Sequence, residues 1–189
     1  MLAAVFMDYK IRQEQKSSES TISSTKPFVL AARNVHKSMI DALALLDLSV
    51  KFMYPKDADS ICVSMVTPDD VKSELEKKQK PMAVYITSPD YLGNTADIEG
   101  ISKVCEECDI PLIVDNAHGA YQAFLDEKKY GTVHPIQSGA AICCDSAHKT
   151  LPVLTGGAYI HVSEKYRERL APHIASYMTI FGSTSPSYL

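Results

Sequence analysis

The chain has 189 residues, 46% of them hydrophobic, and a formal net charge of −4, which suits one globular domain with a sizeable core. Its lysines and arginines are scattered, so no basic field is available for nucleic acid. No apolar run reaches the roughly 18 residues that cross a bilayer, and no signal sequence is recognisable. We therefore expect neither nucleic acid nor a membrane as a partner, and a cytoplasmic location where the five cysteines stay reduced.

The pattern of apolar residues predicts helices and strands that alternate along the chain. Spacing typical of a helix covers 1–9 and continues into a polar end at 10–16, and the segment 17–25, rich in Ser and Thr, is predicted to be a loop. The strands expected after it lie at 28–32, 50–54, 82–87, 112–115, 140–144 and 156–162. The helices expected between and after these strands lie at 35–46, from 68 onward, at 98–108 and at 164–173.

The helix that begins at 68 has the clearest start signal. Thr67 is a favourable N-cap, Pro68 takes the first helical position, and Asp69 and Asp70 place acids in the first turn. Strands that alternate with helices predict a mostly parallel sheet covered on both faces. The fold class is therefore α/β, with three αβα layers.

Polar side chains follow two of the predicted strands. The apolar run at 111–114 ends in Asp115, and the run at 140–144 is followed by Ser146, His148 and Lys149. Each run is typical of a buried strand that delivers its last residues to a crevice at the carboxyl edge of a sheet. If the two strands are neighbours, an acid and an amine lie at one rim.

These residues belong to a series of collinear motifs that runs from about residue 28 to the C-terminus. The series resembles the Orn/Lys/Arg decarboxylase family of pyridoxal 5'-phosphate enzymes, whose fold is aspartate aminotransferase-like (fold type I). The matching motifs are Ala32-Arg-Asn-Val-His-Lys-Ser38, Thr87-Ser-Pro-Asp-Tyr-Leu-Gly93, Val114-Asp-Asn-Ala-His-Gly119, Asp145-Ser-Ala-His-Lys-Thr150, Leu154-Thr-Gly-Gly157 and Gly182-Ser-Thr-Ser-Pro-Ser-Tyr188.

The resemblance implies a role for each candidate around the cofactor ring. Lys149 is expected to hold pyridoxal phosphate as a Schiff base. Asp115 is expected to face the pyridine nitrogen and keep it protonated, Ala117 to let the ring lie against it, and His36 to cover the other ring face. Simpler roles stay open, because Lys149 alone would suit a surface position, and Asp115 and His36 would suit helix caps.

Three further sets of residues are implied to bind the phosphate or the substrate. Ser146 and His148 offer a hydroxyl and a ring N–H to the phosphate. His118 would contact cofactor or substrate, or simply form the pocket wall. Ser183-Thr-Ser185 resembles a loop that reaches the phosphate of a partner subunit, which implies a homodimer or a higher homo-oligomer.

The resemblance also implies that residues 1–189 are only part of a large (major) domain, truncated at both ends. The segment from Leu2 to Phe6 looks like the start of the helix that follows the family's Gly/Ser/Thr phosphate-binding turn. That turn, the strand before it and the C-terminal small domain are expected to be absent. The missing strand would leave the strand at 156–162 as an unpaired apolar edge.

The function expected from the resemblance is decarboxylation of a basic amino acid, namely arginine, lysine or ornithine. Asn116 stands where many members have an acid, which leaves the substrate open. The alternatives are a truncated, catalytically impaired remnant, or an aminotransferase or lyase with the same core. A thiol redox or zinc module on Cys105 and Cys108 is a third alternative, although core packing explains these two residues, as it does the Cys143–Cys144 pair. We expect no metal site.

Overall fold

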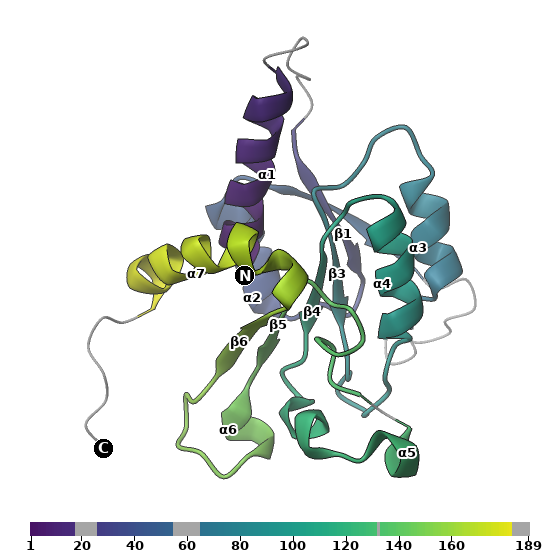
Figure 1. The fold of residues 1–189 in the computed structure, drawn as a ribbon, viewed down its shortest axis with the longest axis vertical. Helices are drawn as coiled ribbons and strands as arrows, with labels where there is room; N and C mark the ends of the chain where they lie inside the picture. The colour runs from purple at the N-terminus through teal and green to yellow at the C-terminus, as the bar shows by residue number, and fades with distance from the viewer. Residues whose placement is uncertain (18–25, 55–64, 132, 183–189) are drawn as a thin grey trace.

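The computed structural model describes residues 1–17, 26–54, 65–131 and 133–182 (Figure 1). It contains one six-stranded sheet in the order β2-β1-β3-β4-β5-β6, in which the first five strands are parallel and β6 is antiparallel to β5. The strands are β1 (Phe28–Ala32), β2 (Ser49–Met53), β3 (Ala83–Thr87), β4 (Leu112–Asp115), β5 (Ile142–Asp145) and β6 (Tyr159–Val162).

Helices connect the strands and cover both faces of the sheet (Figure 1). They are α1 (Leu2–Ser17), α2 (Lys37–Leu45), α3 (Pro68–Leu75), α4 (Ile98–Glu107), η2 (Ala120–Phe124), α5 (Glu127–Tyr130), α6 (Ala147–Thr150), η3 (Glu164–Tyr166) and α7 (Arg167–Phe181). The predicted α/β class with three layers is confirmed. None of the helices in the described ranges combines the length and apolarity needed to cross a membrane.

The predicted elements agree with the structure at most positions. The strands predicted at 28–32 and 112–115 have the observed bounds, and Thr67 caps α3 in a capping box with Asp70. Helix α1 extends to Ser17, one residue into the predicted loop, and the rest of that loop, 18–25, lies outside the described residues. The helix predicted at 164–173 is a short 3₁₀ turn, η3, followed by α7, which continues past Pro172 to Phe181.

The core has two halves because side chains on a strand point alternately to the two faces of the sheet. Leu112 and Val114 of β4 pack with buried residues of α3 and α4. Ile113, between them, packs with buried residues of α1, α2 and α7. Complete burial of each such side chain contributes about 1.5–3 kcal/mol, so both helical layers are held by the same strand.

The carboxyl edge of the sheet brings the chemically interesting segments together. Asp115 is the register partner of Thr87 on β3 and of Cys144 on β5. The chain segments that leave β4 and β5 therefore start side by side, as predicted for an acid and an amine at one rim. Asp115 and Cys144 lie on the same face as Ile113, beneath α1 and α2.

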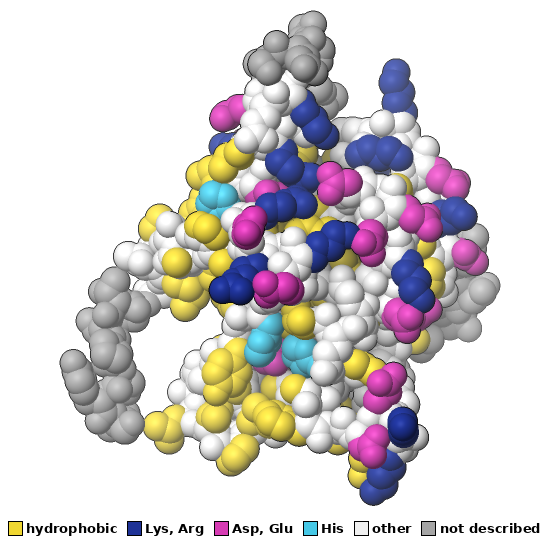
Figure 2. Space-filling model, viewed as in Figure 1, with side chains coloured by type: hydrophobic (Ala, Val, Ile, Leu, Met, Phe, Trp, Pro, Cys, Tyr) yellow, Lys and Arg dark blue, Asp and Glu magenta, His cyan; other side chains and the backbone are white. Residues whose placement is uncertain are grey.

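Strand β6 forms an edge of the sheet, since among the described residues it pairs only with β5. Tyr159 and Ile160 on this strand are 50% and 36% exposed. Hydrophobic side chains gather over β6 and the neighbouring α6 turn (Figure 2). The apolar edge expected from the sequence is therefore present in the described part of the chain, and it is a surface suited to further pairing.

Candidate active site

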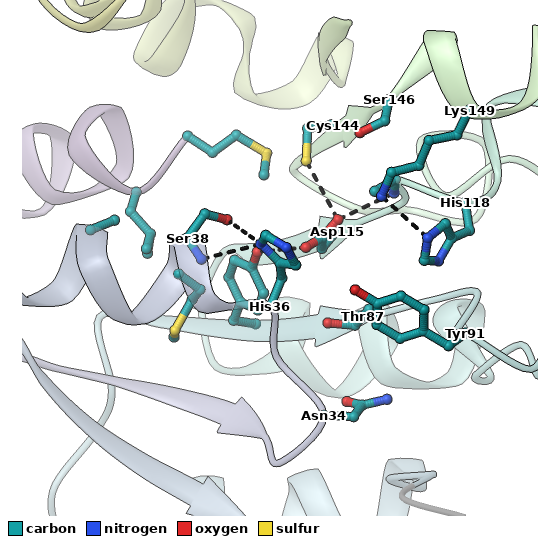
Figure 3. A pocket seen from close by; sticks show the side chains of 16 residues that line it. Asn34, His36, Ser38, Thr87, Tyr91, Asp115, His118, Cys144, Ser146 and Lys149 are labelled. Atoms are coloured by element: carbon teal, nitrogen blue, oxygen red, sulfur yellow. Dashed lines mark hydrogen bonds between the residues drawn. The ribbon is translucent and has the colours of Figure 1, made fainter. Parts of the chain in front are cut away.

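A cavity of about 300 Å³ lies at the carboxyl ends of β3, β4 and β5. Its walls come from the start of α1, the β1–α2 connection with α2, the segment after β3, and the segments that follow β4 and β5 (Figure 3). Of the predicted site residues that the structure describes, all except His148 line this cavity, namely Lys149, Asp115, His36, His118, Ala117 and Ser146.

Lys149 lies in the short helix α6 directly after β5, and its amine points at His118 (Figure 3). The Lys149 Nζ atom is 3.2 Å from His118 Nε2. Burial lowers the pKa of His118, and the positive charge of Lys149 lowers it further, against a smaller opposite effect of Asp115. A neutral imidazole accepts a hydrogen bond from the ammonium, so His118 holds the Lys149 amine in place.

Asp115 is 6% exposed and accepts hydrogen bonds from three donors. The Tyr85 hydroxyl donates to Oδ2 at 3.2 Å, and the Ala117 N–H and the Cys144 thiol donate to Oδ1 at 3.2 and 3.8 Å. Burial, followed by the charge of Asp115, raises the pKa of Tyr85 well above its usual value and that of Cys144 to about 12. Both groups therefore stay protonated and remain donors.

His36 lies at the rim of the cavity and is the N-cap of α2. Its Nδ1 accepts the Ser38 N–H at 3.2 Å and lies 2.9 Å from the Ser38 hydroxyl. His36 therefore caps the helix, as its simpler role implied, and the same side chain also faces the cavity (Figure 3). Its neighbour Lys37 points into solvent and pairs with Asp41 at 2.8 Å.

The two residues predicted to bind phosphate separate in the structure. Ser146 lines the cavity, whereas His148 is exposed and its Nδ1–H donates to the Gly157 carbonyl at 2.9 Å. The structure therefore brings Ser146, but not His148, to the candidate site, because His148 lies on the far side of the α6 turn. The predicted partner-facing segment Ser183-Thr-Ser185 lies outside the described residues.

The structure adds residues to the cavity wall that the sequence did not single out, chiefly Asn34, Tyr85, Thr87, Tyr91 and Cys144. Asn34 Oδ1 and Thr87 Oγ1 are buried without a hydrogen-bond partner among the described residues, which marks them as positions for polar ligand atoms. Asn34, Thr87 and Tyr91 belong to recognised motifs, which was a usable signal. Tyr85 gave none, since a strand tyrosine usually indicates only packing.

The Cys105/Cys108 pair does not form a thiol centre in the structure. Cys105 is buried in α4, and burial raises its pKa to about 12, the reverse of what a reactive thiol needs. Cys108 follows the helix and is exposed, so the core packing predicted for it is wrong. The helix ends one residue earlier than predicted, which places Cys108 outside the buried face.

The fold and cavity define a class of protein, as comparison with solved structures shows. Rhodiola rosea 4-hydroxyphenylacetaldehyde synthase matches with a TM-score of 0.69 and 18% identity, over 93% of this chain and 37% of that chain. Mouse CSAD matches with a TM-score of 0.63 and 18% identity, over 89% of this chain and 36% of that chain. The fold is that of the large domain of pyridoxal phosphate enzymes of fold type I.

Comparison of the amino-acid sequence with known families shows to which family the chain belongs. Residues 18–189 match the model of the Orn/Lys/Arg decarboxylase major domain, and the chain belongs to this family. It is similar to an arginine decarboxylase of Bacillus cereus (32% identity over 85% of this chain) and to the uncharacterized protein YaaO of Bacillus subtilis (33% identity over 85%). The chain spans about a third of these relatives, 34% and 33% of their lengths.

Proposed function

We propose that this chain is the core of a pyridoxal 5'-phosphate-dependent decarboxylase of a basic amino acid, arginine, lysine or ornithine, and that it acts in the cytoplasm. The observation that supports this most is the meeting of the Lys149 amine and the Asp115 carboxylate in one cavity, at the ends of neighbouring parallel strands. Family membership and the names of the relatives favour a basic substrate. The free thiols described by the structure suit a reducing compartment.

The residues present fit the cofactor that the family uses. The aldehyde of pyridoxal phosphate is held by a lysine amine, and a buried carboxylate keeps the ring nitrogen of the cofactor protonated. The cavity supplies both, and the unpartnered oxygens of Asn34 and Thr87 are free to meet polar atoms of a ligand. When bound, pyridoxal phosphate supplies an electron sink for the charge left on the α-carbon as the carboxylate leaves.

The side chains of the protein prepare this site before any ligand enters. His118 accepts a hydrogen bond from Lys149 and so orients the amine toward the cavity. Tyr85 and Cys144 fix the orientation of Asp115. His36, fixed by Ser38, and the Ser146 hydroxyl lie at the wall around them.

Covalent capture of the cofactor tests the site directly. The purified chain is mixed with pyridoxal phosphate, reduced with borohydride and digested, and the labelled peptide is located by mass spectrometry. We expect the label on Lys149 and its loss in Lys149→Ala. Lys37→Ala is the matched control, because Lys37 lies next to His36 at the cavity rim but pairs with Asp41 in solvent. Equal labelling of both variants would overturn the proposal.

Release of CO₂ separates decarboxylation from the alternatives. Arginine, lysine and ornithine are supplied in turn to the chain with pyridoxal phosphate, and CO₂ and keto acid are measured. CO₂ release supports the decarboxylase, and keto acid without CO₂ supports an aminotransferase. Labelling of Lys149 without either product supports a remnant that only binds cofactor.

We also propose that the chain forms a homodimer. The end of α7 exposes Met178, Ile180 and Phe181 by 50%, 66% and 54%. Met178 and Phe181 are three residues apart in the helix and so lie on one face of it, and exposed apolar groups that lie together indicate a protein interface more often than a free surface. A second copy is the partner implied by the resemblance of Ser183-Thr-Ser185 to a loop that reaches a partner subunit.

A further inference from the structure

A cluster of histidine, cysteine and aspartate side chains lies on the face of the sheet opposite the cavity. Cys143 and Asp145 alternate with Cys144 along β5, so they point away from the candidate active site. His161 on β6 is the register partner of Cys143, and His134 approaches from the loop before β5. Histidine side chains are visible beside β5 and β6 in Figure 2.

The donor atoms of this cluster converge on one small volume. His134 Nε2 is 3.1 Å from Asp145 Oδ2, and His161 Nε2 is 2.9 Å from the same oxygen. Cys143 Sγ is 4.0 Å from His134 Nε2. The ligand atoms of His134, Cys143 and Asp145 all lie within 4.8 Å of one another. In a tetrahedral zinc site neighbouring ligand atoms are roughly 3.3–3.8 Å apart, so small shifts suffice for these three side chains. His161 lies outside this group of three, and its ring must shift further to join them as a fourth ligand.

The arrangement does not suit a nucleophile relay. In such a relay one ring nitrogen of the histidine faces the nucleophile and the other faces the acid. Here the Cys143 sulfur and the Asp145 carboxylate both lie at Nε2 of His134. Donors that face one shared point, instead of forming a chain, are what a bound cation requires.

Burial and a neighbouring hydrogen bond support the same conclusion. His134, Cys143 and Asp145 are at most 5% exposed. Asn116 Nδ2 donates to Asp145 Oδ1 at 2.7 Å, which leaves Oδ2 directed at the two imidazoles. Such an outer hydrogen bond commonly orients a carboxylate ligand. The side chain of His161 is 39% exposed and lies at the mouth of the cluster, where it gives a route of entry.

We propose that His134, Cys143, Asp145 and His161 form a tetrahedral zinc site, which the sequence alone did not lead us to expect. The three buried residues supply nitrogen, sulfur and oxygen ligands, and His161 closes the site from the solvent side. The metal would join the loop before β5 to the β5–β6 pair and so hold the strand that leads to Lys149. Its role is structural, and it is independent of the proposed decarboxylase activity.

Zinc binding would break one hydrogen bond that the metal-free cluster makes. His134 Nδ1 accepts the Ile136 N–H at 3.4 Å. This long hydrogen bond is lost when Nε2 becomes a ligand, because Nδ1 then carries the ring proton and can no longer accept. Zinc binds the thiolate form of a cysteine, so uptake of the metal releases a proton.

Cobalt(II) is the probe that tests this site, because it replaces zinc and is coloured. The chain is treated with a chelator, titrated with Co²⁺ and followed by absorbance, without pyridoxal phosphate. We expect the intense visible bands of a tetrahedral ion and a thiolate-to-cobalt charge-transfer band, both removed by Zn²⁺. Absence of these bands in the unaltered chain would overturn the proposal.

Substitutions test which side chains bind the metal. Cys143→Ser should lose the charge-transfer band, whereas the double variant Cys105→Ser/Cys108→Ser, which removes the other thiol pair, should keep it. The reverse result would place the metal elsewhere and overturn the proposal. His134→Gln keeps the thiol and should bind Co²⁺ at least about 100-fold more weakly, and Asn116→Ala about 10-fold more weakly. Circular dichroism shows that each variant is folded, and unchanged affinity in a folded His134→Gln would contradict the assignment.

Discussion

Tyr85 and Cys144 donate hydrogen bonds to the two oxygens of one buried carboxylate, Asp115. Burial keeps both donors protonated at ordinary pH, because it raises their pKa values. The carboxylate therefore has a fixed orientation, and a ligand with a cationic nitrogen meets it without prior rearrangement of the protein.

The Tyr85→Phe variant should show the energetic value of this orientation. We expect a decrease in the free energy of unfolding of about 1 kcal/mol, because the phenol hydrogen bond to Asp115 is lost and the ring still packs. Tyr91→Phe, at the exposed rim of the same cavity, is the matched control and should leave the free energy of unfolding unchanged. Urea unfolding measures both, and equal stability of the two variants would show that the hydrogen bond contributes nothing.

The Lys149→Met variant should raise the pKa of His118. The lysine charge is the second largest cause of the lowered value, after burial, and a nearby cation disfavours the imidazolium. Titration of the His118 ring protons by NMR measures this shift. The pKa is expected to rise, because the lysine charge no longer lowers it and burial is then the main cause that does. Lys37→Met is the control, and a His118 pKa that does not move in Lys149→Met would contradict the observed pairing.

Motifs predicted the location of individual residues better than composition or periodicity did. His36, Asp115, His118 and Lys149 lie far apart in the chain, and only the resemblance related His36 to the other three. Their roles toward a cofactor stay predictions. The position of His148 was not predictable, because the α6 turn directs His148 to Gly157 and Lys149 to the cavity. Sequence spacing does not specify that direction.

Among the elements, helix α3 has the most completely satisfied start. Thr67 Oγ1 accepts the Asp70 N–H at 3.2 Å, and Asp70 Oδ2 accepts the Thr67 N–H at 3.0 Å. These two bonds satisfy backbone donors that a helix otherwise leaves to water. The element was predictable from four residues because its start depends on local contacts alone.

Replacing Thr67 by Ala should lower the free energy of unfolding by about 1 kcal/mol, the usual cost of losing such a cap. Thr95→Ala, at an exposed position in the loop before α4, is the matched control. Urea unfolding followed by circular dichroism compares the two. A Thr67→Ala variant as stable as Thr95→Ala would mean that water replaces the cap without loss.

The end of α7 and the direction of β6 show where local prediction fails. The helix predicted at 164–173 ends too early, because packing of Leu170 and Ile174 against α1 and the sheet supports a longer helix. The predicted strand 156–162 is shorter, starts at Tyr159 and runs antiparallel to β5. Both features depend on contacts between distant segments, which periodicity does not report.

At the scale of the whole molecule, the exposed apolar end of α7 predicts self-association. The double variant Met178→Lys/Phe181→Lys places two charges on one exposed face of the helix and should convert a dimer to a monomer, as measured by sedimentation. Leu45→Lys, which is 68% exposed at the end of α2, is the matched control and should leave the dimer intact. A chain that is monomeric without any substitution would contradict the proposed homodimer.

The hydrogen bond between Asn116 and Asp145 joins the ends of β4 and β5. It restricts which pairs of residues can occupy these two positions during evolution. An acid at position 116 opposite Asp145 would bring two carboxylates to about the same 2.7 Å, where like charges repel. The two positions must therefore change as a pair, with an acid at one site and an amide at the other. In an alignment of relatives, an acid at position 116 should be accompanied by an uncharged partner at position 145.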